Sequence, residues 1–324
     1  MGGLIRLVLG LAALLLASVP GRDARAEEAW PSRTVRLIVP SSPGGGTDVF
    51  GRILAQALTE GLKQTFIVEN RPGASGNIGA QAAAAAAPDG YTFLVSSNNS
   101  TAINQFLYRT SSFNVERDLV PVARGVFAIN TLLVSPSLEA RSVADLVALA
   151  KSRPGTLAYG TAGTGSSPYL GVRMMEEIAG IEVVHVPYKG LGPAYQDLAG
   201  GRLQFMYADL ASALPYVNAG KMRALAVDRR TPLLPDAPTF AEAGWPTFDA
   251  PTSFSVMAPA KVPPPILDRM AAAVGTALRA ATPRLEAQAL LPVFDTPQDF
   301  AASLAKERAM WGAFIQRNTI TADQ

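Results

Sequence analysis

Two glycine-rich turns, far apart in the chain, most constrain what this sequence can fold into. The first covers residues 43–48 and follows the apolar segment 35–39, and the second covers residues 160–167 and follows segment 156–159. Glycine lets a backbone approach a ligand closely, and the first amides of a helix have no partner within that helix. A turn that ends a strand and opens a helix is therefore a site for an anion. The pair predicts an α/β chain in which two turns hold one small anion.

Two further strand ends complete the predicted site. A polar turn at residues 96–101 follows the predicted strand 91–96, and Asp209 follows the apolar strand 203–207. In an open α/β sheet, ligands bind at the carboxyl ends of the strands, where these segments are expected to meet. The candidate ligand-binding residues are Ser41, Ser42, Gly44, Gly45, Gly46, Thr47, Asp48, Ser97, Asn98, Thr161, Ala162, Gly163, Thr164, Gly165, Ser166, Ser167 and Asp209.

Each part of this site also has an ordinary structural interpretation. A single glycine turn is more often a plain connection, and a polar turn such as 96–101 is more often a solvated loop. Ser167 and Asp209 each precede a predicted helix, where either side chain would serve as an N-cap. Capping and ligand binding are compatible, so both interpretations stay open at this point.

Several kinds of catalytic and cofactor site are disfavoured. The first turn lacks the Lys-Ser or Lys-Thr of a phosphate-binding loop, and its glycines do not have dinucleotide spacing. The chain has no cysteine, and its single histidine, His185, lies in an apolar strand pattern that favours a structural role. This composition argues against the usual zinc sites and offers no evident base beside a nucleophilic serine. We expect no catalytic residues, no metal and no cofactor.

The N-terminus has the pattern of an export signal. Arg6 precedes an apolar segment at residues 7–17, and Ala24-Arg25-Ala26 offers a small-x-small cleavage pattern. The apolar segment is shorter than the roughly 20 residues that span a bilayer, so we expect a signal peptide at residues 1–26, cleaved near Ala26, and a periplasmic protein. Of 28 basic and 26 acidic residues this segment holds three and one, which leaves 25 of each. That balance argues against a nucleic-acid partner.

Strand-like and helical segments alternate along the mature chain, which is typical of sheets flanked by helices. Helices are expected at residues 47–62, 78–87, 142–151, 169–178, 193–198, 264–280 and 297–316. Strands are expected at 35–39, 65–68, 91–96, 157–159, 182–186, 203–207, 223–227 and 254–259. The strand-like segment 122–134 predicts a crossing into a second domain, and segment 254–259 predicts the return. We therefore expect one lobe from residues 27–128 with 254–324, a second lobe from residues 129–253, and a hinge of two crossover segments.

Short motifs along essentially the whole mature chain resemble those of one family. They are WPSR at 30–33, PGGGTD at 43–48, VENRPGA at 68–74, GNIG at 76–79, APDGY at 87–91, AGTGSS at 162–167, HVPYKG at 185–190, SALP at 212–215, LPDAPT at 234–239 and EAG at 242–244. In these motifs the chain resembles the Bug-type solute receptors, the extracytoplasmic binding proteins of tripartite tricarboxylate transporters.

The resemblance implies a fold and a function. The implied fold is a type II periplasmic binding protein, with a mixed, mainly parallel sheet flanked by helices in each lobe. The implied function is the capture of a small carboxylate between the lobes, through backbone amides, small hydroxyls and bridging waters, and its delivery to membrane permease subunits. Dicarboxylates, tricarboxylates, aromatic acids and amino-acid relatives all remain candidate ligands, and the receptor is expected to be a monomer.

Three positions depart from the family pattern. Ser41 stands where the family usually has an aromatic residue, Tyr169 stands where a histidine commonly follows the paired serines, and Ala208 replaces a phenylalanine beside Asp209. Because a ring at the position of Ser41 often covers the ligand in the family, the Ser41 departure predicts a roomier or wetter pocket, or a different ligand body.

Two other classes of function compete with a transport receptor. An exported hydrolase would use a serine of the Ser166-Ser167 pair, although the chain lacks the G-x-S-x-G elbow of such enzymes. A sensor domain that reports to a membrane kinase would use the same pocket with a different partner.

Overall fold

The computed structural model describes residues 30–108 and 113–322. The predicted signal peptide and its cleavage site near Ala26 lie outside these residues. The chain divides into two units, residues 1–32 and residues 33–324. In the first unit a cis peptide bond joins Trp30 and Pro31. Everything that follows concerns the second unit.

Two mixed sheets organise residues 33–324. The first has the strand order β11-β4-β10-β3-β1-β2 and the second has the order β7-β6-β8-β5-β9. The first sheet contains β1 (Val35–Val39), β2 (Phe66–Asn70), β3 (Thr92–Ser97), β4 (Leu119–Ala128), β10 (Thr252–Pro259) and β11 (Leu290–Pro292). The second contains β5 (Asn130–Val134), β6 (Ala158–Thr161), β7 (Val184–Pro187), β8 (Phe205–Asp209) and β9 (Arg223–Val227).

Parallel pairing does not predominate, contrary to the expectation for each sheet. Strand β1 pairs in parallel with β2 and β3, but β10 runs antiparallel to both β3 and β4, and β11 runs antiparallel to β4. In the second sheet β6 is parallel to β7 and β8, whereas β5 is antiparallel to β8 and β9. The antiparallel pairs all involve β4, β5 or β10, the strands on which the chain leaves, enters or returns to a sheet, so simple strand-helix alternation does not predict them.

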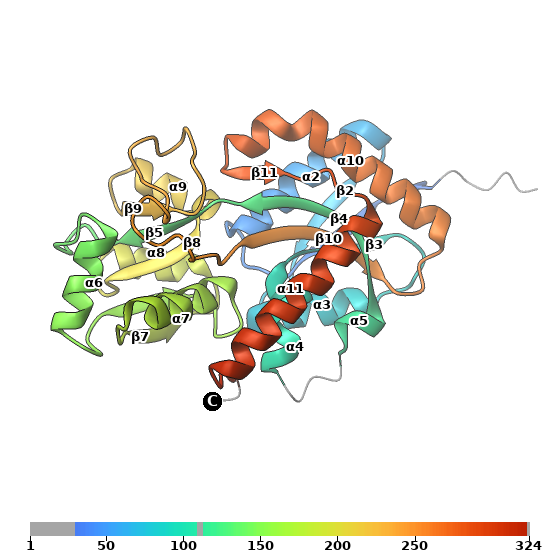
Figure 1. The fold of residues 1–324 in the computed structure, drawn as a ribbon. Coiled ribbons are helices and arrows are strands. Elements are labelled where there is room, and N and C mark those ends of the chain that lie inside the picture. Colours follow the sequence, from blue (N-terminus) through green and yellow to red (C-terminus); the bar gives the residue numbers. More distant parts are fainter. Residues whose placement is uncertain (1–29, 109–112, 323–324) are drawn as a thin grey trace, which may run out of the picture. The chain divides into compact units, whose positions relative to one another are not determined.

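The crossing predicted within residues 122–134 occurs at Ile129. Strand β4 belongs to the first sheet and β5 to the second, and Figure 1 shows them as one long green segment that runs from one sheet into the other. The chain re-enters the first sheet with β10. The exact lobe boundaries expected from the sequence, at residues 128/129 and 253/254, stay a prediction.

Helices connect most of these strands. They are α2 (Gly46–Leu62), α3 (Asn77–Ala84), α4 (Asn104–Leu107), α5 (Val115–Asp118), α6 (Val143–Ser152), α7 (Ser167–Ala179), α8 (Leu191–Ala199), α9 (Leu210–Asn218), α10 (Pro264–Glu286) and α11 (Pro297–Arg317), with a 3₁₀ turn η1 (Ala74–Gly76) and a π-helical turn η2 (Asn99–Ile103). In this part of the chain no helix combines the length and apolar content needed to cross a membrane.

Most predicted helices are confirmed, with shifts at their ends. Helix α3 stops at Ala84 rather than residue 87, because Ala87 precedes Pro88 and a residue before proline disfavours the helical conformation. Helix α10 continues six residues beyond the predicted end and passes Pro283, since Ala281 and Leu285 are buried in this last part. The polar turn expected at residues 96–101 was the larger error, because β3 leads directly into the helical turn η2.

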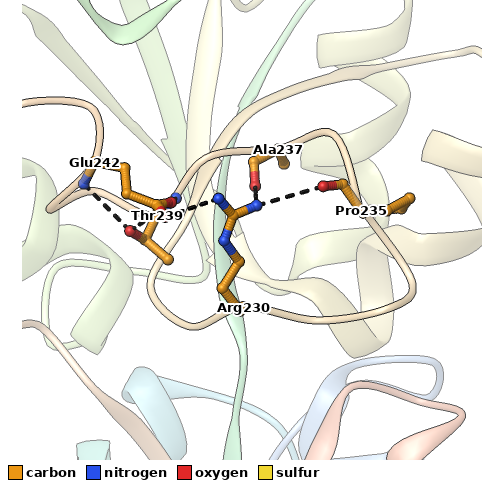
Figure 2. Close-up of polar contacts among 5 residues, drawn as sticks. All are labelled: Arg230, Pro235, Ala237, Thr239 and Glu242. Atoms are coloured by element: carbon orange, nitrogen blue, oxygen red, sulfur yellow. Dashed lines mark hydrogen bonds and ion pairs between the residues drawn. The ribbon is translucent and has the colours of Figure 1, made fainter.

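The irregular segment after β9 is organised by Arg230. The guanidinium donates to the carbonyl oxygens of Pro235 and Ala237 at 3.4 and 3.5 Å and to Glu242 at 2.7 Å, as Figure 2 shows. The Glu242 carboxylate also accepts from the amide and hydroxyl of Thr239. These bonds give a proline-rich loop a defined conformation without a helix or strand.

Candidate functional site

A cavity of about 290 Å³ lies at the ends of strands from both sheets. Most of the predicted ligand-binding residues line it: Ser41, Ser42, Gly45, Gly46, Thr47, Ser97, Ala162, Gly163, Thr164, Ser166, Ser167 and Asp209. Five predicted residues do not line it: Gly44, Asp48, Asn98, Thr161 and Gly165. The two turns are therefore brought together around one cavity, and the five other residues lie outside its lining.

The first turn presents open amide groups to the cavity. Gly45 is the N-cap of α2 and offers no side-chain cap. Its own amide donates to the Ser42 carbonyl at 3.2 Å, but within the described residues the amides of Gly46 and Thr47 have no acceptor. Both residues are buried and line the cavity. The positive end of α2 is thus directed at the cavity without a partner.

Asp48 does not line the cavity, and its carboxylate instead holds the first turn in place. Its carboxylate accepts from the Gly44 amide at 2.9 Å, from Arg52 Nε at 2.9 Å and from Asn70 Nδ2 at 2.8 Å. Asn70 also donates to the Ser41 carbonyl. Burial opposes ionisation of Asp48, but the bonds from Arg52, Gly44 and Asn70 outweigh it and hold the pKa below its usual value. A charged Asp48 therefore stabilises the turn that carries the open amides.

Ser41 adds a hydroxyl to this wall. Its Oγ is buried, and in the described part of the chain it has no hydrogen-bond partner. A buried polar atom without a partner is unfavourable, and a bound ligand or water would satisfy it. Ser41 thus offers a small hydroxyl donor at this wall.

The second turn has little free hydrogen-bonding capacity. The Gly163 amide donates to Thr161 Oγ1 at 3.1 Å, and the Ser166 amide to the Gly163 carbonyl at 3.1 Å. The Gly165 amide donates to Ser75 Oγ, and the Ser167 amide donates to Asn99 Oδ1 at 2.8 Å. The expectation that this turn supplies many backbone donors needs correction, because most of its amides already have acceptors.

The two serine hydroxyls of the second turn also have hydrogen-bond partners. Ser166, and not Ser167, is the N-cap of α7, where its Oγ accepts from the Tyr169 amide. The Ser167 hydroxyl lies 2.9 Å from Thr252 Oγ1. Among the described residues of this turn, Ala162 and Thr164 retain amides without an acceptor, and both line the cavity.

His185 supports the second turn from outside the cavity. Its Nε2 lies 2.7 Å from Thr161 Oγ1, and its ring packs against Tyr159 and Tyr169. Burial, aided by the charge of Arg173, lowers the pKa of His185 to about 4. The ring is therefore neutral at pH 7 and holds Thr161, which in turn accepts from Gly163. This placement confirms a structural role and leaves the two serines without a base.

Asp209 combines the two roles that the sequence left open. It is the N-cap of α9, with Oδ1 accepting from the Ser212 amide at 2.9 Å and from Ser212 Oγ at 2.8 Å. It also lines the cavity and is 5% exposed. Burial raises the pKa of Asp209 against the effect of these two bonds.

Sequence reasoning missed several residues of the cavity wall. Asn99 lines it, whereas its neighbour Asn98 turns away and donates to the Pro251 carbonyl and to Glu307. The helical turn η2 makes this difference, since consecutive residues on a helix face different directions. Other wall residues not predicted from the sequence include Ser75, Tyr108, Tyr188, Lys189, Gly190, Thr252 and Phe254. Among the described residues that line the cavity, Lys189 is the sole basic side chain.

Several hydrogen bonds among the described residues join segments of the two sheets beside the cavity. They include Asn99 Oδ1 with the Ser167 amide, Ser75 Oγ with the Gly165 amide, Ser42 Oγ with the Lys189 carbonyl at 3.4 Å, and Ser167 Oγ with Thr252 Oγ1 at 2.9 Å. Residues 30–108 and 113–322 contain no group of three His, Asp or Glu side chains that could hold a metal ion. The site is a small cavity with open helix-start amides on one wall.

The family model described as the tripartite tricarboxylate transporter family receptor matches residues 50–320. Protein BugT of Bordetella pertussis is 36% identical over 295 residues, which cover 89% of this chain and 90% of BugT. The chain belongs to this receptor family.

Solved structures extend the family likeness to the fold. R. palustris Rpa4515, solved with adipate, is 35% identical with a TM-score of 0.85, over 90% of this chain and 99% of that one. MatC from Rhodopseudomonas palustris, solved with bound malate, is 28% identical with a TM-score of 0.82, over 88% and 100%. The two-lobe periplasmic binding protein fold expected from the sequence is thereby confirmed.

Members of the receptor family bind solutes and are not enzymes, so the hydrolase interpretation is wrong. The geometry gives a physical reason for this. Ser166 Oγ donates to the Gly163 carbonyl at 2.7 Å, and Ser167 Oγ is paired with Thr252. Among residues 30–108 and 113–322, neither hydroxyl has a base as a hydrogen-bond partner, as nucleophilic catalysis requires.

Proposed function

We propose that this protein captures a small carboxylate in the cavity and delivers it, chemically unchanged, to the membrane subunits of a tripartite tricarboxylate-type permease. The observation that carries the proposal is the pair of open amides, Gly46 and Thr47, at the start of α2. A helix N-terminus favours a negative group through its dipole and its unpaired N–H groups. Two solved relatives, one with adipate and one with bound malate, support an organic acid.

The ligand class follows from the size and charge of the wall. A cavity of about 290 Å³ is at the small end for ligand sites, which favours a compact molecule. The first carboxylate accepts from Gly46, Thr47 and Ser41, and Thr164 completes its surroundings from the opposite turn. Lys189 at the wall favours a second carboxylate, so a dicarboxylate is the first ligand to test, ahead of tricarboxylates, aromatic acids and amino-acid relatives.

Delivery requires a conformational change that the fold can support. The ligand-bound state keeps the bonds from Asn99 and Ser75 to the second turn and adds the ligand's own bonds. A ligand that interacts with both walls stabilises that state over an open one. Periplasmic location, signal cleavage near Ala26, a monomeric receptor and permease subunits as partners belong to the same proposal.

A panel of acids tests the function directly. Thermal shift and calorimetry with succinate, malate, adipate, citrate, benzoate, terephthalate and glutamate are compared with the methyl esters of the same acids. At a hundredfold excess over its Kd, a true ligand adds roughly 2.7 kcal/mol of stability. The proposal predicts that at least one free acid binds and that its ester does not. A panel in which no acid binds, or in which esters bind equally, contradicts it.

A matched pair of variants tests the open amides. Thr47→Pro removes the Thr47 amide, and proline is tolerated in the first turn of a helix. Thr47→Ala removes the same side chain but keeps the amide. We expect Thr47→Pro to bind the best acid at least about tenfold more weakly than Thr47→Ala, which corresponds to one charge-assisted hydrogen bond. Equal affinities for the two variants would remove this amide from the site.

A further inference from the structure

Asp209 is an unusual residue in the wall of a site that holds an anion, because its own side chain is an acid. Its carboxyl group is almost fully buried, and within the described chain it accepts hydrogen bonds only from the amide and hydroxyl of one residue, Ser212. Within the described chain no lysine or arginine forms an ion pair with it. A buried carboxylate without a cation is unfavourable already, before any ligand arrives.

The open amides of α2 lie next to this carboxyl group. A Cβ atom built on Gly46 would lie 2.3 Å from Asp209 Oδ1 and 2.7 Å from its Cγ. Standard bond lengths and a usual hydrogen-bond distance then place a ligand oxygen on the Gly46 amide within about 8 Å of Oδ1. Two carboxylates that close, in a buried site, repel each other unless one of them is protonated.

The titratable groups around Asp209 do not remove this repulsion. Across from it on α2, Asp48 is negative and is paired with Arg52. On α8, Tyr195 reaches only Ser212, with a distance of 2.7 Å between the two oxygens. On β5, Asn130 is the register partner of Asp209 and donates to the buried acid Asp228.

The remaining charged group of the cavity wall is Lys189. It is exposed, and the structure records no contact between its ammonium group and Asp209. Phe254 on β10 brings no charge to the site. The local field of the protein therefore does not favour a second negative charge beside Asp209.

We propose that loading of the receptor takes up one proton from solvent, which Asp209 carries in the complex with its O–H facing the bound carboxylate. This inference rests on the proposed function, because it assigns a role within the same site. No covalent bond changes, and the proton returns to solvent when the ligand leaves. Burial already raises the pKa of Asp209 in the free receptor, and the bound anion raises it further. Since the complex binds one proton more than the free receptor, affinity falls as the pH rises.

The experiment measures Kd and proton uptake with adipate and with malate. Calorimetry between about pH 6.5 and 8.5 keeps the ligands ionised, and two buffers of different ionisation enthalpy report the number of protons exchanged. We expect Kd to rise about tenfold per pH unit where Asp209 is charged in the free receptor and protonated in the complex. We expect an uptake of one proton at the acidic end of this range.

Two variants separate Asp209 from other buried acids. Asn caps a helix as well as Asp, so Asp209→Asn should fold, and its affinity should be independent of pH with no proton uptake. Asp228→Asn is the control, because burial raises the pKa of Asp228 to about 6 and this residue does not line the cavity. It should retain the proton uptake of the unmodified receptor.

Three results would overturn the inference. The first is binding of adipate with a flat pH profile and no proton uptake, which leaves the proposed function intact. The second is loss of the uptake in Asp228→Asn and its retention in Asp209→Asn. The third is binding of malate alone without uptake, which would mean that a charged Asp209 accepts the ligand hydroxyl. Failure of every acid to bind at any pH would instead remove the proposed function, and this inference with it.

Discussion

The turn that opens α2 and the turn that opens α7 look alike in sequence, yet their amides have different partners. At the start of α2 the amides of Gly46 and Thr47 face the cavity with no acceptor in the described chain. At the start of α7 the amides of Gly165 and Ser167 are taken by Ser75 and Asn99. The comparison shows that two glycine-rich helix starts in one fold can differ in whether their amides are free or already bonded. The first turn leaves amides free at the cavity, and the second bonds two of its amides to segments of the other sheet.

The two turns are also supported differently. A charged residue, Asp48, holds the first turn, with a pKa below its usual value because hydrogen bonds outweigh the opposing effect of burial. A neutral residue, His185, holds the second turn through Thr161, with a pKa lowered to about 4 mainly by burial. Stability from Asp48 is present above the ordinary pKa of an aspartate and is lost as the pH falls through its lowered value. The two supports therefore respond to acid over different pH ranges.

The largest expected effect comes from the first turn. In Gly46→Ala the new methyl group would lie 2.3 Å from Asp209 Oδ1 and 3.0 Å from Phe254 Cζ. The segments cannot approach as they do here, so we expect at least about a hundredfold loss of affinity for the best acid, or 2.7 kcal/mol. Calorimetry measures the loss, and circular dichroism checks the fold.

Gly61→Ala is the matched control on the same helix. A Cβ at Gly61 meets nothing within 4 Å, so this variant should bind normally and gain up to about 1 kcal/mol of stability from helix propensity. An unchanged Kd in Gly46→Ala would mean that the first turn does not bind the acid.

Local sequence signals predicted much of this fold. The strands at residues 35–39 and 223–227 match β1 and β9, and the crossing was correctly placed in the segment that contains Ile129. Local signals failed where pairing is long-range. The antiparallel partners of β10 lie more than a hundred residues away, and the short strand β11 is recognisable only beside β4.

For the candidate site, too, local sequence signals predicted many of the residues but not their long-range hydrogen-bond partners. Glycine turns identified the cavity wall, since their local backbone requirements are visible in the sequence. The sequence did not indicate which amides stay open, because the acceptors Ser75 and Asn99 come from distant segments. Asn98 was predicted to line the cavity, but its neighbour Asn99 does. The reason is the helical turn η2, which was expected to be a loop.

The second prediction tests whether the second turn serves closure or ligand binding. Asn99→Ala removes the acceptor of the Ser167 amide, which is 2.8 Å away. If this bond closes the cavity, the variant should bind the best acid about tenfold more weakly, which is about 1.4 kcal/mol. Ser75→Ala frees the Gly165 amide, which does not line the cavity, and should behave in the same way. Stronger binding by Asn99→Ala would show that a freed Ser167 amide serves the ligand and that the two turns are equivalent.

The third prediction concerns the neutral support of the second turn. Because the pKa of His185 is lowered to about 4, the unfolded chain binds a proton near pH 6.5 while the folded protein does not. Stability should therefore fall between pH 6.5 and 4, by about 1–2 kcal/mol after allowance for the partial exposure of the ring. Denaturant unfolding of His185→Gln should show a shallower pH slope over this range. An identical slope in the variant would mean that His185 is not the residue that titrates.

The smallest effect is expected from a contact that joins the two sheets outside the cavity. Glu177 on α7 lies 3.4 Å from Arg317 on α11, and the two side chains are 45% and 62% exposed. An exposed ion pair contributes little, so Glu177→Gln should change stability by less than about 0.5 kcal/mol and Kd by less than about twofold. Any residual effect should disappear in 1 M salt, where screening acts over about 3 Å. A change in Kd of more than about fivefold would mean that closure is driven from outside the cavity. Affinity would then depend less on the hydrogen bonds of the two turns than their geometry indicates.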